Sequence, residues 1–234
     1  MQRVTIDLSR PLRLRYRDSL HAALVSGLRA GGAPEALVIG LAAAPWTFAT
    51  TGISYPGGMT VIRSVTLSTS DPTLGAHLLK LDPATVRHIS TNGDKPDCAG
   101  GTLRVDPLPF LPGQDSLTVG FASPFLISVR EAAIKSYARA IAGLDLSAAF
   151  SAGLSRRLHR EVRLSVAPDR LSAATDGARP ILVRVRKSGG RDLILPALSA
   201  VLTLHGPPAD LRDAYLGGLG EKTRYGFGCP LVLA

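Results

Sequence analysis

The chain has 234 residues, of which 45% are hydrophobic and 19% are charged, and its formal net charge is +9. This composition excludes an intrinsically disordered chain, and the length suits one large domain or two small ones. No run of about 18 apolar residues occurs, so we expect neither a membrane-spanning helix nor a membrane partner.

The start of the chain and its cysteines bear on location. Residues 3–8 alternate between polar and apolar side chains, as a half-buried strand does, and the long apolar core of a signal peptide is missing. The two cysteines, Cys98 and Cys229, are too few for a disulfide framework. No Cys or His spacing resembles a zinc site. We therefore expect a cytoplasmic protein that uses no metal and no cofactor.

The first half of the chain predicts an alternation of strands and helices. Leucines recur every fourth residue from Leu20 to Leu28, which indicates a helix that ends at two glycines. A Tyr-Pro-Gly-Gly turn separates the next two strands. In chain order we expect a strand at 3–8, a helix at 17–28, strands at 46–51 and 60–68, a helix at 73–81, and strands at 102–105 and 116–121.

A second unit is expected to begin near Ser123, which gives an N-terminal unit at 1–122 and a C-terminal unit at 123–234. The Ser188-Gly189-Gly190 turn between two apolar runs predicts a hairpin. The expected elements are a strand at 125–130, a mostly helical alanine-rich segment at 131–158, an extended segment at 162–166, hairpin strands at 181–187 and 192–195, a strand at 200–204, a helix at 209–216 and a last strand made from residues 225–227 and 230–233.

A glycine-rich segment near the C-terminus carries the strongest functional signal. Two Gly-x-Gly pairs bracket five residues that include Lys222 and Arg224. Glycine allows a positive φ and a close approach of other groups, and such a loop can turn N–H groups towards phosphate oxygens. It is no Walker A loop, because Gly-Lys-Ser/Thr is missing. A glycine-rich turn without a ligand is the alternative.

The order Gly218-Leu219-Gly220-Glu221-Lys222, followed by Gly226-Phe227-Gly228, resembles the C-terminal glycine-rich loop of the CRISPR repeat-RNA-processing endoribonucleases of the RAMP superfamily, the sixth CRISPR-associated protein family. The resemblance implies an α+β fold of two tandem ferredoxin-like βαββαβ units that bind CRISPR repeat RNA. It also implies metal-independent cleavage, in which the ribose 2′-hydroxyl attacks the adjacent phosphate and mature guide RNA results.

The helix at 17–28 carries the best catalytic candidate, His21, one turn after Arg17. Members of the family keep a histidine in or just after this helix as a general base, a role that suits a pKa near neutrality. Arg17 and Lys222 are candidates for stabilising the charge of the transition state. Tyr16 is a weaker candidate for positioning. The alternative is a histidine that only packs or faces solvent.

Most of the excess positive charge lies in one segment, residues 151–191, where ten cations and three anions leave a net +7. Nucleic acid is the expected partner of such a segment, although an acidic protein surface is an alternative. The expected RNA-binding residues are Arg156, Arg157, Arg160, Arg163, Arg184, Arg186, Lys187 and Arg191, together with Gly218, Gly220, Arg224, Gly226 and Gly228 of the glycine-rich segment.

Two other functions stay open. RAMP folds also serve as non-catalytic guide-RNA-binding subunits of CRISPR effector complexes, in which case other subunits would be partners and His21 would have no catalytic purpose. A nucleotide-binding metabolic enzyme is the alternative from another class. The missing Walker A pattern, the lack of an acidic ribose-binding residue in a βαβ context and the basic segment argue against it.

Overall fold

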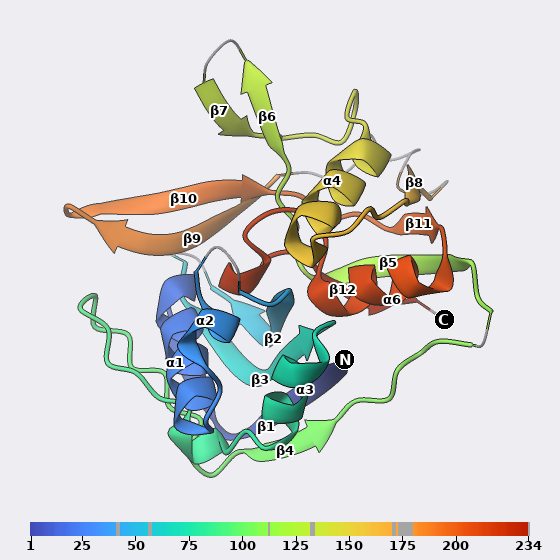
Figure 1. Ribbon diagram of the computed structural model, residues 1–234. Helices are drawn as coiled ribbons and strands as arrows, with labels where there is room; N and C mark the ends of the chain where they lie inside the picture. Colours follow the sequence, from blue (N-terminus) through green and yellow to red (C-terminus); the bar gives the residue numbers. More distant parts are fainter. Residues whose placement is uncertain are drawn as a thin grey trace.

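The computed structural model describes residues 1–40, 43–55, 58–111, 113–131, 134–169, 172 and 180–233. Two four-stranded antiparallel sheets dominate it, each accompanied by helices, and two further hairpins extend from the second sheet (Figure 1). Within these residues, no helix is long and apolar enough to span a bilayer.

The first sheet has the strand order β2-β3-β1-β4. Its elements are β1 (Gln2–Leu14), α1 (Arg17–Ala30), α2 (Glu35–Val38), β2 (Trp46–Ser54), β3 (Thr60–Thr69), α3 (Pro72–Leu79), a 3-10 turn (Pro83–Thr85) and β4 (Thr102–Val105). Leucines of α1 and α3 pack on apolar residues of the three long strands to form the first core. Two helices therefore link four strands in the order 4-1-3-2, which is the ferredoxin-like arrangement.

The second sheet, β12-β5-β11-β8, repeats this order. Its elements are β5 (Ser116–Ser123), α4 (Leu146–Leu158), β8 (Ser165–Pro168), β11 (Leu202–His205), α6 (Pro208–Gly217), a 3-10 turn (Thr223–Tyr225) and β12 (Cys229–Val232). Two hairpins are inserted into it, β6 (Ser128–Glu131) with β7 (Ile134–Tyr137), and β9 (Ile181–Ser188) with β10 (Arg191–Ala197). The expected α+β fold of two tandem ferredoxin-like units is confirmed, and both hairpins lie outside the repeated pattern.

Two local expectations were wrong. The alanine-rich segment 131–158 is not mostly helical, because residues from Ile134 to Tyr137 pair with β6 and the helix begins only at Leu146. The Asp145 carboxylate accepts a hydrogen bond from the N–H of Ala148 and so caps that helix. At the C-terminus, residues 223–225 form a 3-10 turn in place of a strand, and only the last four-residue strand pairs with β5.

The strand at 116–123 belongs to the second sheet, whereas we expected it to end the first unit. β4 already completes the first sheet by pairing with β1, and β5 lies between β11 and β12. The local pattern of a short strand cannot reveal which sheet it joins. We propose that the boundary between the two units falls between Val105 and Ser116.

The units are joined by buried polar contacts as well as by packing. Arg3 of β1, which is 4% exposed, donates a hydrogen bond of 2.8 Å to the backbone oxygen of Pro230 in β12. Its guanidinium also lies over the ring of Tyr215 in α6, 4.8 Å from the ring centroid. Thr47 of β2 donates to the backbone oxygen of Phe227 at 2.9 Å. The end of the chain is therefore fixed against the first unit.

The start of α1 depends on a carboxylate from a distant loop. The capping position, Tyr16, makes no side-chain cap, but the buried Asp94 accepts hydrogen bonds from the N–H groups of Arg15 and Tyr16 and from the Ser19 hydroxyl. A negatively charged acceptor at the N-terminus of a helix also interacts favourably with the helix dipole. Asp94 thereby sets the position of the helix that carries Arg17 and His21.

We expect Asp94→Ala to lower the free energy of unfolding by about 1–3 kcal/mol, because buried N–H donors lose their acceptor. Asp97→Ala is the matched control, since Asp97 caps only an exposed turn through the N–H of Ala99. Urea unfolding of both variants measures the difference. Equal stability of the two would contradict the role given to Asp94.

Candidate functional site

The candidate site lies where α1 and β2 of the first unit meet the glycine-rich loop, defined here as residues 217–228. The aromatic ring of Tyr225 in this loop stacks on His21 of α1, with 4.4 Å between ring centroids and 26° between ring planes. Trp46 at the start of β2 lies almost parallel to the same imidazole, 5.8 Å away. His21 is therefore oriented by stacking between an aromatic residue of each unit.

The surroundings of His21 favour the neutral imidazole. Burial, and to a smaller extent the positive charge of Arg224, lower the pKa of His21 to about 4. The imidazole is therefore uncharged at neutral pH, and the uncharged form is the one that can act as a general base. A bound anion would act in the opposite direction and raise this pKa.

Two cations of the loop, Lys222 and Arg224, lie near the stacked rings. Lys222 is exposed and adopts a left-handed backbone conformation, with its Nζ 5.9 Å from the centroid of the Tyr225 ring. Arg224 donates a hydrogen bond of 2.7 Å to the backbone oxygen of Gly40 in the first unit. Lys222 thus lies beside Tyr225, the ring that stacks on His21, and Arg224 supplies a positive charge near His21.

Arg17 is turned into the protein, towards the loop. It donates a hydrogen bond to the backbone oxygen of Gly226, and its guanidinium lies 5.1 Å from the centroid of the Phe227 ring. Burial lowers its pKa to about 10, so the group keeps its charge at neutral pH. One N–H of the guanidinium is used in this contact, and the group has five in all.

The glycines of the loop are required by close packing. Four of its five glycines, all except Gly217, take a positive φ. A Cβ on Gly226 would lie 2.6 Å from the Phe48 ring, and one on Gly228 would lie 1.7 Å from the backbone oxygen of Leu219. The N–H groups of Gly226 and Gly228 donate to the oxygens of Thr223 and Pro124. These two amides are satisfied within the chain, so the structure assigns them to packing and not to the phosphate contact that we expected.

Arg157 holds the loop from the opposite side. This half-buried side chain of α4 donates to the backbone oxygens of Gly217 at 3.0 Å and Gly218 at 2.7 Å, and to the Thr223 hydroxyl at 2.7 Å. Burial, with the neighbouring cations Arg156 and Arg224, lowers its pKa to about 10. The Arg157 side chain, for which we expected an RNA contact, therefore holds the loop.

The hairpin β6–β7 is tied to the loop through Glu221. The Glu221 carboxylate accepts hydrogen bonds from the Ser128 hydroxyl at 2.5 Å and from Lys135 Nζ at 2.8 Å. Its N–H donates to the backbone oxygen of Leu126. The backbone next to Lys222 is therefore also held by the β6–β7 hairpin.

Several expected RNA-binding cations are already paired with carboxylates. Arg160 contacts Asp210 at 2.6 Å and Asp213 at 2.5 Å at the start of α6. Arg163 pairs with Glu161 at 2.8 Å, and Arg184 pairs with Asp192 at the same distance. These pairings reduce the charge available to a nucleic acid, and the net +7 of the segment overstates its exposed charge.

The remaining cations of the segment are exposed. Within the described part of the chain, Arg156 at the end of α4 and Arg186, Lys187 and Arg191 at the end of the β9–β10 hairpin form no ion pair. Arg170 and Arg179, which are two of the ten cations in segment 151–191, lie outside the described residues. The hairpin end is therefore the main cationic surface that the segment offers.

Similarity to known proteins agrees with this arrangement. Residues 117–231 match the family model described as CRISPR-associated protein Cas6, C-terminal. The second half of the chain is therefore similar to the C-terminal region of Cas6 proteins. The matched region begins in β5 and ends in β12, so it spans the second sheet and the glycine-rich loop. No curated protein matches the chain in sequence.

Solved structures share the fold over the whole chain. A Cas6-related protein from Pyrococcus furiosus has a TM-score of 0.69 at 15% identity and covers 99% of this chain and 98% of its own. A RAMP protein described as binding different RNA substrates has a TM-score of 0.68 at 13% identity, with full coverage of both chains. A Cas6 product complex has a TM-score of 0.58 at 17% identity and covers 100% of this chain and 99% of its own.

Sequence reasoning missed the aromatic and anchoring residues of this candidate site. Trp46 is the single tryptophan of the chain, and Tyr225 is an aromatic residue in a basic glycine-rich loop, which is a usable signal for stacking. Nothing local marked Glu221 as an anchor or Asp94 as a cap. Among the described residues, no three His, Cys, Asp or Glu side chains gather in a way that could hold a metal ion.

We expect the His21 imidazole to titrate near pH 4, well below the ordinary value of about 6.5. Because the pKa of His21 is lower in the folded state than in the unfolded state, neutral His21 favours folding above about pH 6.5. This contribution to folding stability is lost as the pH falls towards 4. Histidine NMR signals, assigned with His21→Gln, measure the midpoint. Arg224→Gln should raise it and Arg29→Gln on the same helix should not. A midpoint near 6.5 would mean that the ring is solvated.

Proposed function

We propose that this protein is an endoribonuclease that binds CRISPR repeat RNA and cleaves it, without a metal ion, into mature guide RNA. The observation that carries the proposal is the neutral, stacked imidazole of His21, which lies beside Tyr225 and within the cationic surroundings of Lys222 and Arg224. The Cas6 match of the C-terminal half and the RNA complexes among its structural relatives support the same function.

The proposed reaction is an attack of a ribose 2′-hydroxyl on the adjacent phosphate, which leaves a cyclic phosphate and a free 5′-hydroxyl. Neutral His21 would take the proton of the attacking hydroxyl, and the departing 5′-oxygen would take up a proton from water. The phosphorane that forms carries extra negative charge, which Lys222 and Arg224 can stabilise electrostatically. Arg17 adds a buried positive charge one helical turn from His21.

A bound phosphate would itself raise the pKa of His21. In the free protein, burial keeps the pKa of His21 at about 4, which makes it a weak base. A phosphate bound next to the ring favours the imidazolium and raises the pKa towards the working pH, where general base catalysis is most effective. Substrate binding would thus activate the residue that acts on the substrate.

A non-catalytic guide-RNA subunit is the second candidate. The tight anchoring of the loop by Arg157 and Arg17 would serve an RNA-binding scaffold equally well. The stacked His21 distinguishes the two functions, because a scaffold gains nothing from an unprotonated imidazole at the surface of its RNA-binding loop.

The proposed function is tested with repeat RNA in the presence of EDTA. We expect cleavage to persist, and to stop when a single 2′-deoxy nucleotide precedes the scissile phosphate. His21→Ala should reduce the cleavage rate by roughly 10²–10⁴-fold with RNA affinity nearly unchanged, the range typical of a lost general base. Leu79→Ala, at an exposed position of α3, is the control for handling and folding.

Each outcome has a separate meaning. Cleavage of the deoxy substrate would exclude attack by the 2′-hydroxyl. Full activity of His21→Ala would assign the base to another residue. Tight binding without any cleavage by the wild-type protein would favour the scaffold.

The RNA path is tested by reversing exposed charge at the end of the β9–β10 hairpin. Because Arg186, Lys187 and Arg191 have no ion-pair partners in the described part of the chain, changing all three to Glu should weaken RNA binding. The slope of log affinity against log salt should fall by about 2–3, since each lost phosphate contact contributes roughly 0.7–0.9.

The matched control is Arg63→Glu, Lys80→Glu and Lys95→Glu, which makes the same change in net charge at exposed positions of the first unit. Filter binding over a range of salt concentrations gives both slopes. An equal effect of the two triple variants would indicate a general charge effect and would exclude a path along the hairpin.

A further inference from the structure

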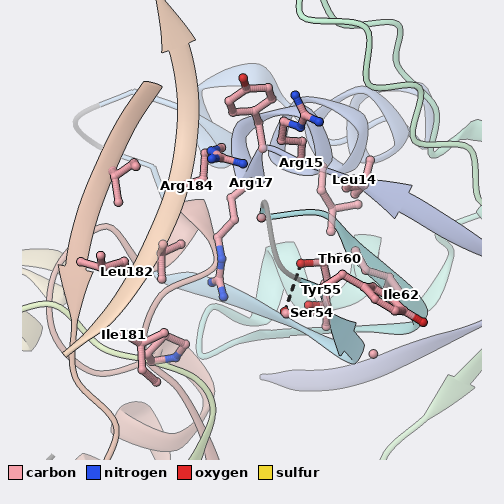
Figure 2. Close-up of a pocket in the computed structure, with 18 of the residues that line it drawn as sticks. Leu14, Arg15, Arg17, Ser54, Tyr55, Thr60, Ile62, Ile181, Leu182 and Arg184 are labelled. Carbon is pink, nitrogen blue, oxygen red and sulfur yellow. Dashed lines mark hydrogen bonds between the residues drawn. The ribbon is translucent and has the colours of Figure 1, made fainter. Parts of the chain in front are cut away.

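A cavity of about 600 Å³ lies between the β9–β10 hairpin and the first sheet. Residues of β1, β2, β3 and the start of α1 line it on one side, and the β9–β10 hairpin of the second unit lines it on the other (Figure 2). The volume is within the range of small-ligand sites. The reaction proposed above does not use the cavity, although Arg17 belongs to both sites.

The walls of the cavity are apolar and partly open to solvent. Ile181, Leu182 and Ile194 line it from the hairpin, with Leu14 and Ile62 on the side of the first sheet. The three hairpin residues are 44%, 70% and 43% exposed. Apolar side chains that gather at this exposure around a hollow indicate a binding surface.

Three arginines line the same cavity. Arg184 pairs with Asp192, which also accepts a hydrogen bond of 2.8 Å from the Tyr16 hydroxyl, so the hairpin is held against the start of α1. Arg17 extends between the hairpin and the first sheet (Figure 2) and reaches the glycine-rich loop through the oxygen of Gly226. Arg15 is exposed at the rim.

Hydroxyl groups complete the lining. Ser54 Oγ and Thr60 Oγ1 lie 3.2 Å apart at the ends of β2 and β3, on the wall opposite the hairpin (Figure 2). Hydroxyls both donate and accept hydrogen bonds, so they can contact either kind of group on the edge of a base. The cavity thus combines flat apolar walls, an edge with hydroxyls and a cationic rim.

We propose that this cavity binds one unpaired nucleotide of the repeat RNA, with the base between Leu182 and Ile62 and a flanking phosphate against the exposed Arg15 at the rim. The inference rests on the proposed function, which it extends by a specific subsite. Arg17 connects the two places, so the strand that passes His21 continues into the cavity.

The chemistry of the lining favours a nucleotide over a peptide segment. A purely apolar peptide would leave the guanidinium group of Arg15 desolvated without an anion, which is costly. A nucleotide carries both a flat ring that fits apolar walls and a phosphate that pairs with arginine in a bidentate geometry. An unpaired base is also free of the unpairing cost that a base in a duplex carries.

The inference is tested by abasic scanning of repeat RNA that carries a 2′-deoxy nucleotide at the cleavage position, so that binding is measured without cleavage. An abasic residue, which keeps the backbone and lacks the base, is introduced at each unpaired position in turn. We expect one position to lose roughly 5- to 100-fold in affinity, the range for a lost base contact, and the other unpaired positions to change little.

A double variant then links that position to the cavity. Ile181→Ser with Leu182→Ser removes the hairpin wall at exposed positions, and Val105→Ser with Leu231→Ser is the matched control at strand positions that are 51% and 46% exposed. The wall variant should bind intact RNA as weakly as the wild type binds the sensitive abasic RNA. Combining the wall variant with the abasic RNA should lower the affinity no further than either change alone. The control variant should keep the wild-type profile.

Fluorescence gives an independent measurement. 2-Aminopurine at the sensitive position should change in intensity when the wild-type protein binds, and the change should be lost in the wall variant. Uniform tolerance of abasic residues, or additive losses for wall and base, would overturn the inference while leaving RNA cleavage intact. A protein that neither binds nor cleaves repeat RNA would overturn the proposed function and the subsite together.

Discussion

The inward-facing carbonyl groups of the glycine-rich loop are the constraint on which the candidate site depends. A buried carbonyl needs a hydrogen-bond donor, and here the donors are side chains of three separate elements. Arg157 of α4 satisfies Gly217 and Gly218, Arg17 of α1 satisfies Gly226, and Thr47 of β2 satisfies Phe227. The loop is thus fixed to both units, and the stacking of Tyr225 on His21 follows from that attachment.

Arginine suits these anchoring positions because of its geometry. The planar guanidinium of Arg157 donates to three acceptors of the loop at once. The ammonium group of a lysine, on a flexible stem, would hold these acceptors in a less defined geometry. Burial lowers the pKa of Arg17 and Arg157 only to about 10, so both stay charged at neutral pH. The same side chains therefore hold the loop and contribute positive potential around it, and part of the basic character of the chain serves the architecture of the site.

The sequence predicted those features that depend on local pattern. The leucine stripe gave α1, the Ser-Gly-Gly turn gave the β9–β10 hairpin, and the glycine pairs indicated the loop and, by resemblance, its partner helix. Features set by distant residues could not be predicted. Arg160 is neutralised by Asp210 and Asp213, about fifty positions later. The cavity likewise requires the two units to be brought together. The error at Ile134–Tyr137 is local instead, because this strand pairs with β6 directly before it in the chain and the alanine-rich composition did not reveal that hairpin.

The two hairpins are insertions that leave the 4-1-3-2 order of the second sheet unchanged. Lengthening a surface connection costs little in loop-closure entropy, so such a hairpin can vary in length and sequence while the sheet below it persists. The β9–β10 hairpin carries the exposed cations and one wall of the cavity, whereas His21 and the loop anchors lie elsewhere. The hairpin, with its cations and its cavity wall, can therefore change without a change at His21, provided that each new hairpin keeps an acceptor such as Asp192 for the Tyr16 hydroxyl at the start of α1.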